Sequence, residues 1–169
     1  MASPAKAIRE FAPANRDALV GLMIELQTFE ARFAPGRTPA DEAFGVWYID
    51  RLLDLLHERD GVLLVAVLEG ASCGFCAGYA EEEPEAREHY FYIAELVVSE
   101  RHRGRGIGTR LIAEMEDLAR SRGLNTTGIS VLAGSERVHR LYHRLLPRLR
   151  YQAAQAPGRN SWLAGRMRA

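Results

Sequence analysis

Residues 90–123 of the chain read YFYIAELVVSERHRGRGIGTRLIAEMEDLARSRG. This order predicts an apolar strand, a short turn rich in arginine and glycine, and a helix that ends at Gly123. The first N–H groups of a helix have no partner within it, and the peptide dipoles add partial positive charge there. Gly104, Gly106 and Gly108 carry no side chain that would keep a ligand from the backbone. The turn therefore suits a phosphate group, and the neighbouring arginines add forked donors for its oxygens.

Two common phosphate motifs do not fit this turn. The dinucleotide fingerprint needs a third glycine where the chain has Thr109, and it should follow the first strand of a parallel unit. The nucleoside triphosphate loop ends in Gly-Lys-Ser/Thr, whereas the chain's one lysine is Lys6. A glycine-rich surface turn with solvated arginines stays open as the plain structural alternative.

The whole string from Val97 to Gly108, followed by a helix, resembles the acyl-CoA-binding motif of the GNAT superfamily of N-acyltransferases. That motif is Arg/Gln-x-x-Gly-x-Gly/Ala, and Arg103, Gly106 and Gly108 take its three defined positions. The resemblance implies that amides of the turn hold the CoA diphosphate and that the preceding strand aligns the pantetheine arm. The cofactor-binding residues it implies are Leu96, Val97, Val98, Arg103, Gly104, Arg105, Gly106, Ile107, Gly108 and Thr109.

Glu95 is the one charged residue in the strand before the turn. Alternation places it on one face with Phe91, Ile93 and Val97. If that face is packed, an unpaired carboxylate there is costly or takes up a proton, and a carboxylate poised in this way suits a general base. An open cleft or an ion pair with an arginine is the structural alternative. In GNAT enzymes a glutamate at this place removes the acceptor amine's proton, directly or through water, so the resemblance assigns that role to Glu95.

The resemblance implies further parts of a transfer site. A bulge in the strand, supplied by Leu96 to Val98, would free an N–H group to polarise the thioester carbonyl, as an oxyanion-hole donor does. The family motif Asn-x-x-Ala-x-x-Leu/Phe-Tyr is met in part by Leu141 and Tyr142, whereas Ser135 stands in place of the asparagine. Tyr142 would protonate the leaving CoA thiolate, with a core tyrosine as the alternative. Ser135 would contact the cofactor through one hydroxyl in place of an amide.

The rest of the chain alternates strand and helix patterns around this stretch. Asn15 and Thr38 are the predicted N-caps of two helices, and Ser135 is the predicted cap of a later one. Glu81 to Glu88 is expected to be an acidic loop that ends a strand, and a second hypothesis has it attract a cationic acceptor. Further strands are predicted over residues 7–11, 61–68, 72–80, 126–132, 151–154 and 161–167.

These elements predict one domain over residues 1–169 of the α/β class, α+β type. Because a crossover helix joins residues 90–98 to 126–132, those two strands should run parallel. The resemblance implies a mixed, mostly antiparallel sheet of six or seven strands, flanked by about four helices, in which the two central parallel strands splay apart.

Two groups of side chains have both a functional and a structural interpretation. Phe33, Phe44, Trp47 and Tyr48 are candidates for lining the acceptor pocket, since the family builds that pocket from its first two helices; simple core packing is the alternative. Cys73 and Cys76 form a C-x-x-C within a predicted strand, where they would point to opposite faces. We interpret both cysteines as small core residues.

Composition narrows the function further. Acidic and basic residues balance at 22 each, which argues against nucleic acid or an anionic membrane as a partner. The start MASPAKAIREF lacks an apolar leader, and no run approaches the ~20 apolar residues of a membrane span, so a cytoplasmic location is expected. No metal is expected. The oligomeric state is open, a homodimer included.

The sequence therefore predicts an N-acetyltransferase that moves an acetyl group from acetyl-CoA to a primary amine of a small molecule or peptide, by direct transfer in a ternary complex. A module that senses acyl-CoA without catalysis is the alternative, since it would need the turn but neither Glu95 nor Tyr142. A nucleic-acid-binding protein is disfavoured by the balanced charge. The acceptor amine and the acyl-chain preference stay open.

Overall fold

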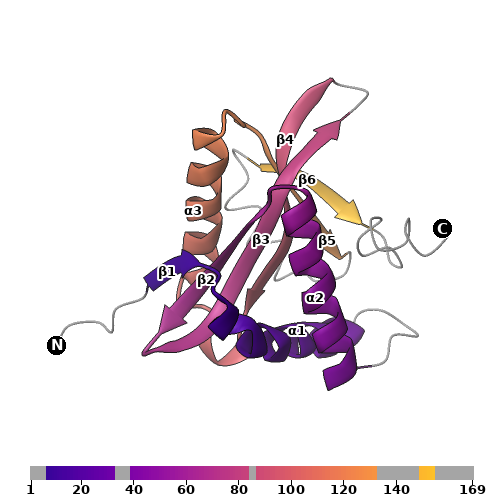
Figure 1. Ribbon diagram of the computed structural model, residues 1–169, viewed down its shortest axis with the longest axis vertical. Coiled ribbons are helices and arrows are strands. Elements are labelled where there is room, and N and C mark those ends of the chain that lie inside the picture. The colour runs from indigo at the N-terminus through magenta and orange to yellow at the C-terminus, as the bar shows by residue number, and fades with distance from the viewer. Residues whose placement is uncertain (1–6, 33–38, 84–86, 133–148, 155–169) are drawn as a thin grey trace.

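A mixed sheet organises the chain in the computed structural model, which describes residues 7–32, 39–83, 87–132 and 149–154 (Figure 1). Four residues singled out from the sequence, Phe33, Thr38, Ser135 and Tyr142, lie outside the described residues, as does the strand expected over 161–167. The helix expected from Ser135 lies outside them as well.

The described residues form six strands that lie side by side in chain order. The strands are β1 (Ala7–Glu10), β2 (Val62–Leu68), β3 (Ala71–Glu83), β4 (Glu88–Val98), β5 (Thr127–Leu132) and β6 (Leu149–Ala154). Neighbours from β1 to β4 pair antiparallel, whereas β4 with β5 and β5 with β6 pair parallel. The mixed α+β fold and the parallel pairing across the crossover helix are thus confirmed, and β6 extends the parallel part by one strand.

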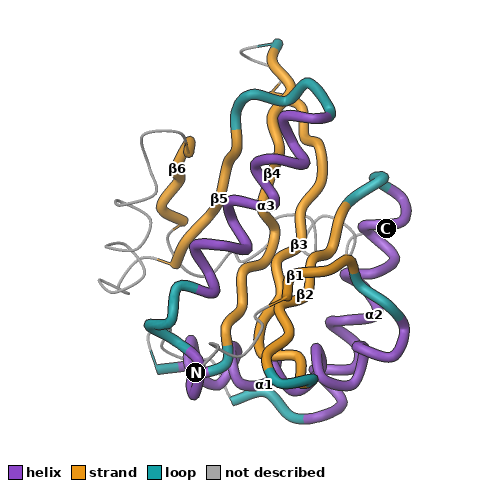
Figure 2. The backbone as a smooth tube through the Cα atoms, turned by 90° about the vertical axis from the view of Figure 1, so that its left-hand side faces the viewer, coloured by secondary structure: helices purple, strands orange, loops and turns teal. Residues whose placement is uncertain are grey.

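Three α-helices within the described residues cover the two faces of the sheet (Figures 1 and 2). The helices are α1 (Arg16–Ala31), α2 (Glu42–Glu58) and α3 (Ile107–Ser121), with short 3-10 turns η1 (Pro13–Asn15) and η2 (Glu100–His102). One face, here the α3 face, packs Leu111 and Met115 against the sheet. The other, the α1/α2 face, packs Leu19 and Ile49 against it. Strand β2 is buried along its whole length, as its unbroken apolar run predicts.

Strands β4 and β5 stay together over a short distance only. Their paired residues are Phe91 to Ile93 on β4 and Thr127 to Ile129 on β5. Beyond these pairs β4 continues to Val98 and β5 to Leu132, so the carboxyl ends of two parallel neighbours separate. This separation leaves one edge of β4 without a strand partner among the described residues.

Asn15 is the N-cap residue of α1, as predicted, but its side chain makes no cap bond to that helix and accepts a bond from the Ala12 N–H instead, at 3.1 Å. Helix α2 begins at Glu42, and its N-cap is Asp41, whose carboxylate accepts a bond from the Phe44 N–H at 2.8 Å. Aspartate is as good an N-cap residue as threonine, and the helix starts after Asp41 and not after the predicted cap Thr38.

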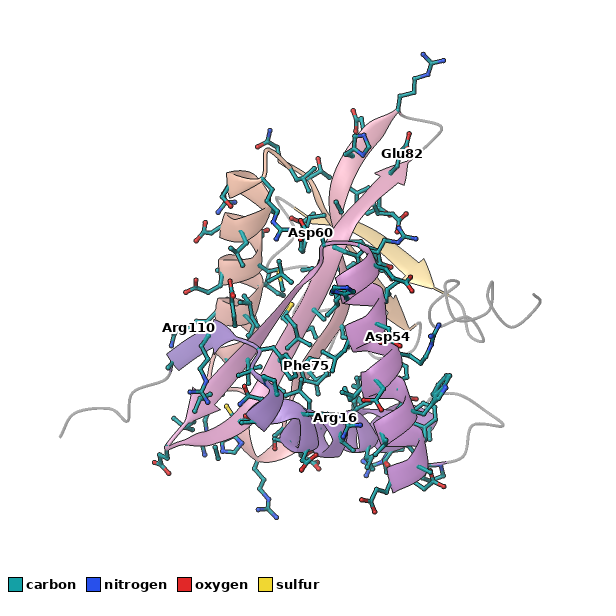
Figure 3. All side chains as sticks on the ribbon, viewed as in Figure 1. Arg16, Asp54, Asp60, Phe75, Glu82 and Arg110 are labelled. Carbon is teal, nitrogen blue, oxygen red and sulfur yellow. The ribbon has the colours of Figure 1, made fainter. Side chains whose placement is uncertain are left out.

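The acidic segment is also placed differently from the prediction. Strand β3 runs on through Glu83 and β4 begins at Glu88, so Glu81 pairs with Tyr90 and Glu82 with His89. Figure 3 shows Glu82 on this hairpin, which projects beyond the rest of the sheet. Most of these acidic residues therefore lie in paired strands and not in a loop.

Candidate active site

A bulge in β4 decides which face Glu95 occupies. Ala77 of β3 pairs with Glu95, and Gly78 pairs with Ile93, so Ala94 is an extra residue on β4. Phe91 and Ile93 therefore pack on the α3 face, whereas Val97 packs on the α1/α2 face. The prediction that all four side chains share one face is wrong, because the extra residue reverses the alternation after Ile93.

Hydrogen bonds at the two ends of β4 agree with this bulge. The Phe91 N–H donates to the Thr126 carbonyl on the β5 side, and the Ser99 N–H donates to the Cys73 carbonyl on the β3 side, both at 2.9 Å. In a regular strand, two residues separated by an even number of positions would donate to the same side. The extra residue at Ala94 shifts the alternation by one, which explains why the Phe91 and Ser99 amides point to opposite sides. The same shift directs the amides of Leu96 and Val98 toward the edge from which β5 has separated. The bulge thus lies at Ala94, earlier than the predicted Leu96 to Val98, and those residues follow it.

A glycine on the facing strand accompanies the bulge. A Cβ atom on Gly78 would lie 2.4 Å from the Phe91 ring and 2.7 Å from the Tyr92 carbonyl oxygen, so a larger residue would clash. A second bulge, at Cys73, explains a further correction. Ala66 pairs with Gly74 and Val67 with Ser72, so Cys73 and Cys76 both lie in the α3-face core and not on opposite faces.

The Glu95 carboxylate is buried, with 4% of the residue exposed, and it accepts a hydrogen bond from the Tyr48 hydroxyl of α2. Tyr48 is itself 2% exposed. The Tyr48 hydroxyl is thus a neutral hydrogen-bond donor to this carboxylate. Burial raises the pKa of the Cys76 thiol well above its usual range, and the negative charge of Glu95 raises it further. Glu95 thus bonds to Tyr48 on the α1/α2 face, and its charge raises the pKa of Cys76 on the α3 face.

The turn before α3 has the backbone that its glycines predict. Gly104 and Gly106 both adopt φ +76°, a left-handed conformation that other residues rarely take, and Gly106 is the N-cap of α3. Among described residues, the N–H groups of Gly104, Gly106 and Ile107 to Thr109 donate to no backbone carbonyl; the first such bond of the helix runs from Arg110 to Gly106. The amides at this helix start are thus arranged as a phosphate site requires.

The turn sits close to the open edge of β4. A Cβ on Gly108 would lie 3.6 Å from Val98 and 3.9 Å from Leu96, so the first turn of α3 approaches the two residues whose amides face that edge. A methyl group fits this space, which agrees with the glycine or alanine of the motif. Turn amides and strand amides therefore border one region of the molecule.

Arg103 braces the turn. Its Nε donates to the Val98 carbonyl at 3.0 Å, and its guanidinium lies 4.8 Å from the centre of the Phe29 ring on α1. Glu25 of α1 accepts a bond from the Glu100 N–H at the start of η2. Helix α1 therefore supports the turn through Glu25 and Phe29, two contacts that sequence reasoning missed because nothing in the local pattern links α1 to residues 100–103.

The aromatic residues at the start of α2 form one cluster. Ring centres lie 5.7 Å apart for Phe44 and Tyr48, 5.8 Å for Phe44 and Trp47, and 6.3 Å for Trp47 and Tyr48. Trp47 is 45% exposed, whereas Tyr48 is buried. The sequence proposed Tyr48 as a pocket-lining ring, but its bond to Glu95 was missed. The available signal was the need of a buried tyrosine hydroxyl for a polar partner.

The described residues contain no group of three or more His, Cys, Asp or Glu side chains that could hold a metal ion. No helix among them is both long enough and apolar enough to cross a bilayer.

Comparison with known proteins agrees with the geometry of the turn and of the bulged strand. The model of the acetyltransferase (GNAT) family matches residues 23–146, which include the bulged strand and the glycine turn. Among curated proteins, none matches the sequence closely enough to count as a relative.

Solved structures share the fold at low sequence identity. A transcriptional regulator from Bacillus halodurans has a TM-score of 0.68 at 17% identity, covering 84% of this chain and 92% of its own. A ribosomal-protein-alanine N-acetyltransferase from Brucella melitensis biovar Abortus has a TM-score of 0.61 at 22% identity, with coverage of 92% and 96%. An aminoglycoside acetyltransferase from an uncultured soil metagenomic sample has a TM-score of 0.61 at 20% identity, with coverage of 90% and 95%.

Proposed function

The chain belongs to the acetyltransferase (GNAT) family, and on that premise we propose that it transfers an acetyl group from acetyl-CoA to a primary amine in a ternary complex. The observation that carries the proposal is the junction at the end of β4. There, among the described residues, turn amides without a backbone partner, an edge of β4 without a strand partner and the buried Glu95 carboxylate lie within a few residues of one another.

The turn supplies the proposed anchor for acetyl-CoA. Its amides from Gly104 to Thr109 would donate to the diphosphate at the positive end of α3. The pantetheine arm would then lie along the open edge of β4, where the Leu96 and Val98 amides are directed. One of these two amides would donate to the thioester carbonyl oxygen, where negative charge develops as the amine attacks.

The chemistry requires one base and one acid. An acceptor that arrives as an ammonium first loses one proton to solvent. Glu95 would then take a proton from the amine, directly or through water, as the amine nitrogen forms a bond to the thioester carbonyl carbon. The carbon–sulfur bond of the resulting tetrahedral intermediate then breaks. The CoA thiolate would receive the proton of the Tyr142 hydroxyl, and the product amide leaves. Holding both reactants in one complex would supply much of the rate.

The acceptor proposed is a primary amine on a small molecule or a peptide. Two proteins with the same fold are named for acting on a ribosomal-protein alanine and on aminoglycosides, which are amines of these two kinds. A balanced net charge gives no reason to add a nucleic acid or a membrane as partner.

The test is a panel of primary amines assayed with acetyl-CoA, reading the free thiol of the released CoA, alongside calorimetry with CoA alone. We expect heat of binding with CoA and thiol release with at least one class of amine. Binding of CoA without thiol release for any amine would favour a sensing module over an enzyme. Absence of binding would remove the proposal altogether.

A further inference from the structure

The hydrogen bond between Tyr48 and Glu95 joins two buried side chains from different layers of the fold. Tyr48 comes from the middle of α2 and Glu95 from β4, 47 positions later in the chain, and both are nearly inaccessible to solvent. A neutral hydroxyl that donates to a buried carboxylate favours its charged form and fixes the direction of its oxygen atoms. A contact of this kind can therefore control a base without touching the substrate.

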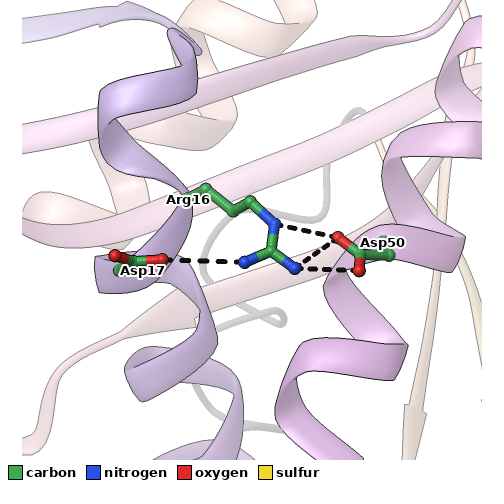
Figure 4. Close-up of polar contacts among 3 residues, drawn as sticks. All are labelled: Arg16, Asp17 and Asp50. Carbon is green, nitrogen blue, oxygen red and sulfur yellow. Dashed lines mark hydrogen bonds and ion pairs between the residues drawn. The ribbon is translucent and has the colours of Figure 1, made fainter.

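Helix α2 contacts α1 on both sides of Tyr48. Three residues before it, a Cβ on Gly45 would lie 2.7 Å from Ile24, so the two helices cross in close contact at this glycine. Two residues after it, Asp50 accepts three hydrogen bonds of 2.7 to 2.9 Å from the Arg16 guanidinium of α1, as Figure 4 shows. The position of the Tyr48 hydroxyl is thus set by the packing of α1 on α2.

Glu95 is held in place by the bulge. The extra residue at Ala94 turns its side chain to the α1/α2 face, and Gly78 on β3 allows the close backbone approach that the bulge needs. Donor and acceptor are therefore both placed before any substrate binds, which is how precise sites are preorganised.

From this geometry we propose that Tyr48 is a positioning residue for Glu95: its hydroxyl holds the carboxylate in the orientation and the charge state in which it accepts the acceptor's proton. The inference rests on the proposed function, in which Glu95 is the base. Tyr48 is the group on α2 that donates a hydrogen bond to the Glu95 carboxylate, whereas the charge of Glu95 raises the pKa of the buried Cys76 thiol on β3.

The test is the Tyr48→Phe variant, which removes one oxygen and keeps the ring. We expect kcat to fall about 10- to 100-fold, the scale of one hydrogen bond to a charged group, with the KM for acetyl-CoA unchanged. The matched control is Tyr79→Phe, since Tyr79 on β3 is also 2% exposed and contacts Tyr92 and Arg59 instead of Glu95. In a Glu95→Gln background Tyr48→Phe should have no further effect on kcat. A fall of the same size in that background, or in Tyr79→Phe, would overturn the assignment.

A second measurement keeps the inference separate from the enzymatic proposal. Carbon-13 NMR of the glutamate side-chain carboxyl groups, recorded at one pH with no substrate present, reports on the surroundings of Glu95, the Glu95→Gln spectrum identifying its signal. In Tyr48→Phe we expect that signal to move, because the carboxylate has lost a hydrogen-bond donor, whereas Tyr79→Phe should leave it in place. An unmoved signal in Tyr48→Phe would overturn the positioning role even where acetyl transfer is observed. A moved signal in a protein that acetylates no amine would instead leave the contact in place and reject the enzymatic proposal.

Discussion

The glycine turn before α3 and the Tyr48–Glu95 pair meet at the same strand but are built from different parts of the chain. The turn offers main-chain N–H groups, and its requirement is a backbone conformation at Gly104 and Gly106. The pair offers two side chains, and its requirement is that α2 and a bulged β4 bring them together. A site made of backbone tolerates changes of side chain as long as φ is kept, whereas a site made of side chains depends on the packing of distant elements.

The proposed site thus has a main-chain half, the glycine turn, and a side-chain half, the Tyr48–Glu95 pair. The largest expected effect tests the side-chain half. Glu95→Gln should lower kcat by about 100- to 10,000-fold, the usual range for loss of a general base, while CoA binding measured by calorimetry stays unchanged. The matched control is Glu116→Gln on α3, whose side chain is 15% exposed and pairs with Arg120 away from β4. If Glu95→Gln weakened CoA binding as much as it slowed transfer, the division between the two halves would be wrong.

A smaller effect tests the main-chain half. Gly106→Ala forces alanine into φ +76°, and relief of that strain would turn the neighbouring amides away from the proposed diphosphate, so we expect the Kd for CoA to rise about tenfold, the equivalent of one lost hydrogen bond to a charged group. Gly70→Ala is the matched control, because Gly70 has φ +83° in the β2–β3 turn and an added Cβ meets nothing within 4 Å in either case. Both variants should lose about 1–2 kcal/mol of stability from backbone strain. Equal CoA affinities in the two would exclude the turn as the diphosphate site.

The same division explains what could be predicted from the sequence. The turn lies within a few consecutive residues, so its glycines and its helix start could be read locally, and α3 begins at the turn as expected. The burial of β2 followed from its unbroken apolar run in the same way.

The side-chain half could not be predicted so well, because it depends on register. One extra residue at Ala94 moves Glu95 to the face opposite Phe91 and Ile93. A second extra residue, at Cys73, brings Cys73 and Cys76 to one face. Gly74 and Gly78 hinted at irregular strands, but a glycine does not say on which strand the extra residue lies. The bond from Tyr48 follows only once α2 is packed over β4, since 47 positions separate the two residues.

The pH dependence of stability tests whether Glu95 on one face of the sheet affects Cys76 on the other. Burial, with the charge of Glu95 as a second cause, raises the pKa of Cys76 in the folded protein above the ~8.5 of an unfolded thiol. A raised pKa means that the unfolded state loses its proton first, so this contribution to stability is complete below pH ~8.5 and declines as the pH rises beyond it, by up to ~1.4 kcal/mol per pH unit.

The measurement is the urea midpoint as a function of pH in the wild-type protein and in Cys76→Ala. Between pH 8 and 10 the wild type should lose stability more steeply than Cys76→Ala, by the equivalent of one proton. Parallel curves would mean that the thiol ionises as easily in the folded state as in the unfolded one. A slope reduced in Glu95→Gln as well would show that the carboxylate acts across the sheet.

The smallest expected effect concerns the ion pair that joins α1 to α2. Arg16 and Asp50 form a forked pair, but their side chains are 33% and 50% exposed, so water competes for both charges. Their coupling free energy, from a double-mutant cycle of Arg16→Met and Asp50→Asn in urea unfolding, should be about 0.2–1 kcal/mol and should shrink in 1 M salt. The kcat should hardly change, because the close crossing at Gly45 keeps α2 in place. A coupling well above this range, together with a large loss of kcat, would mean that charge rather than packing places Tyr48 against Glu95.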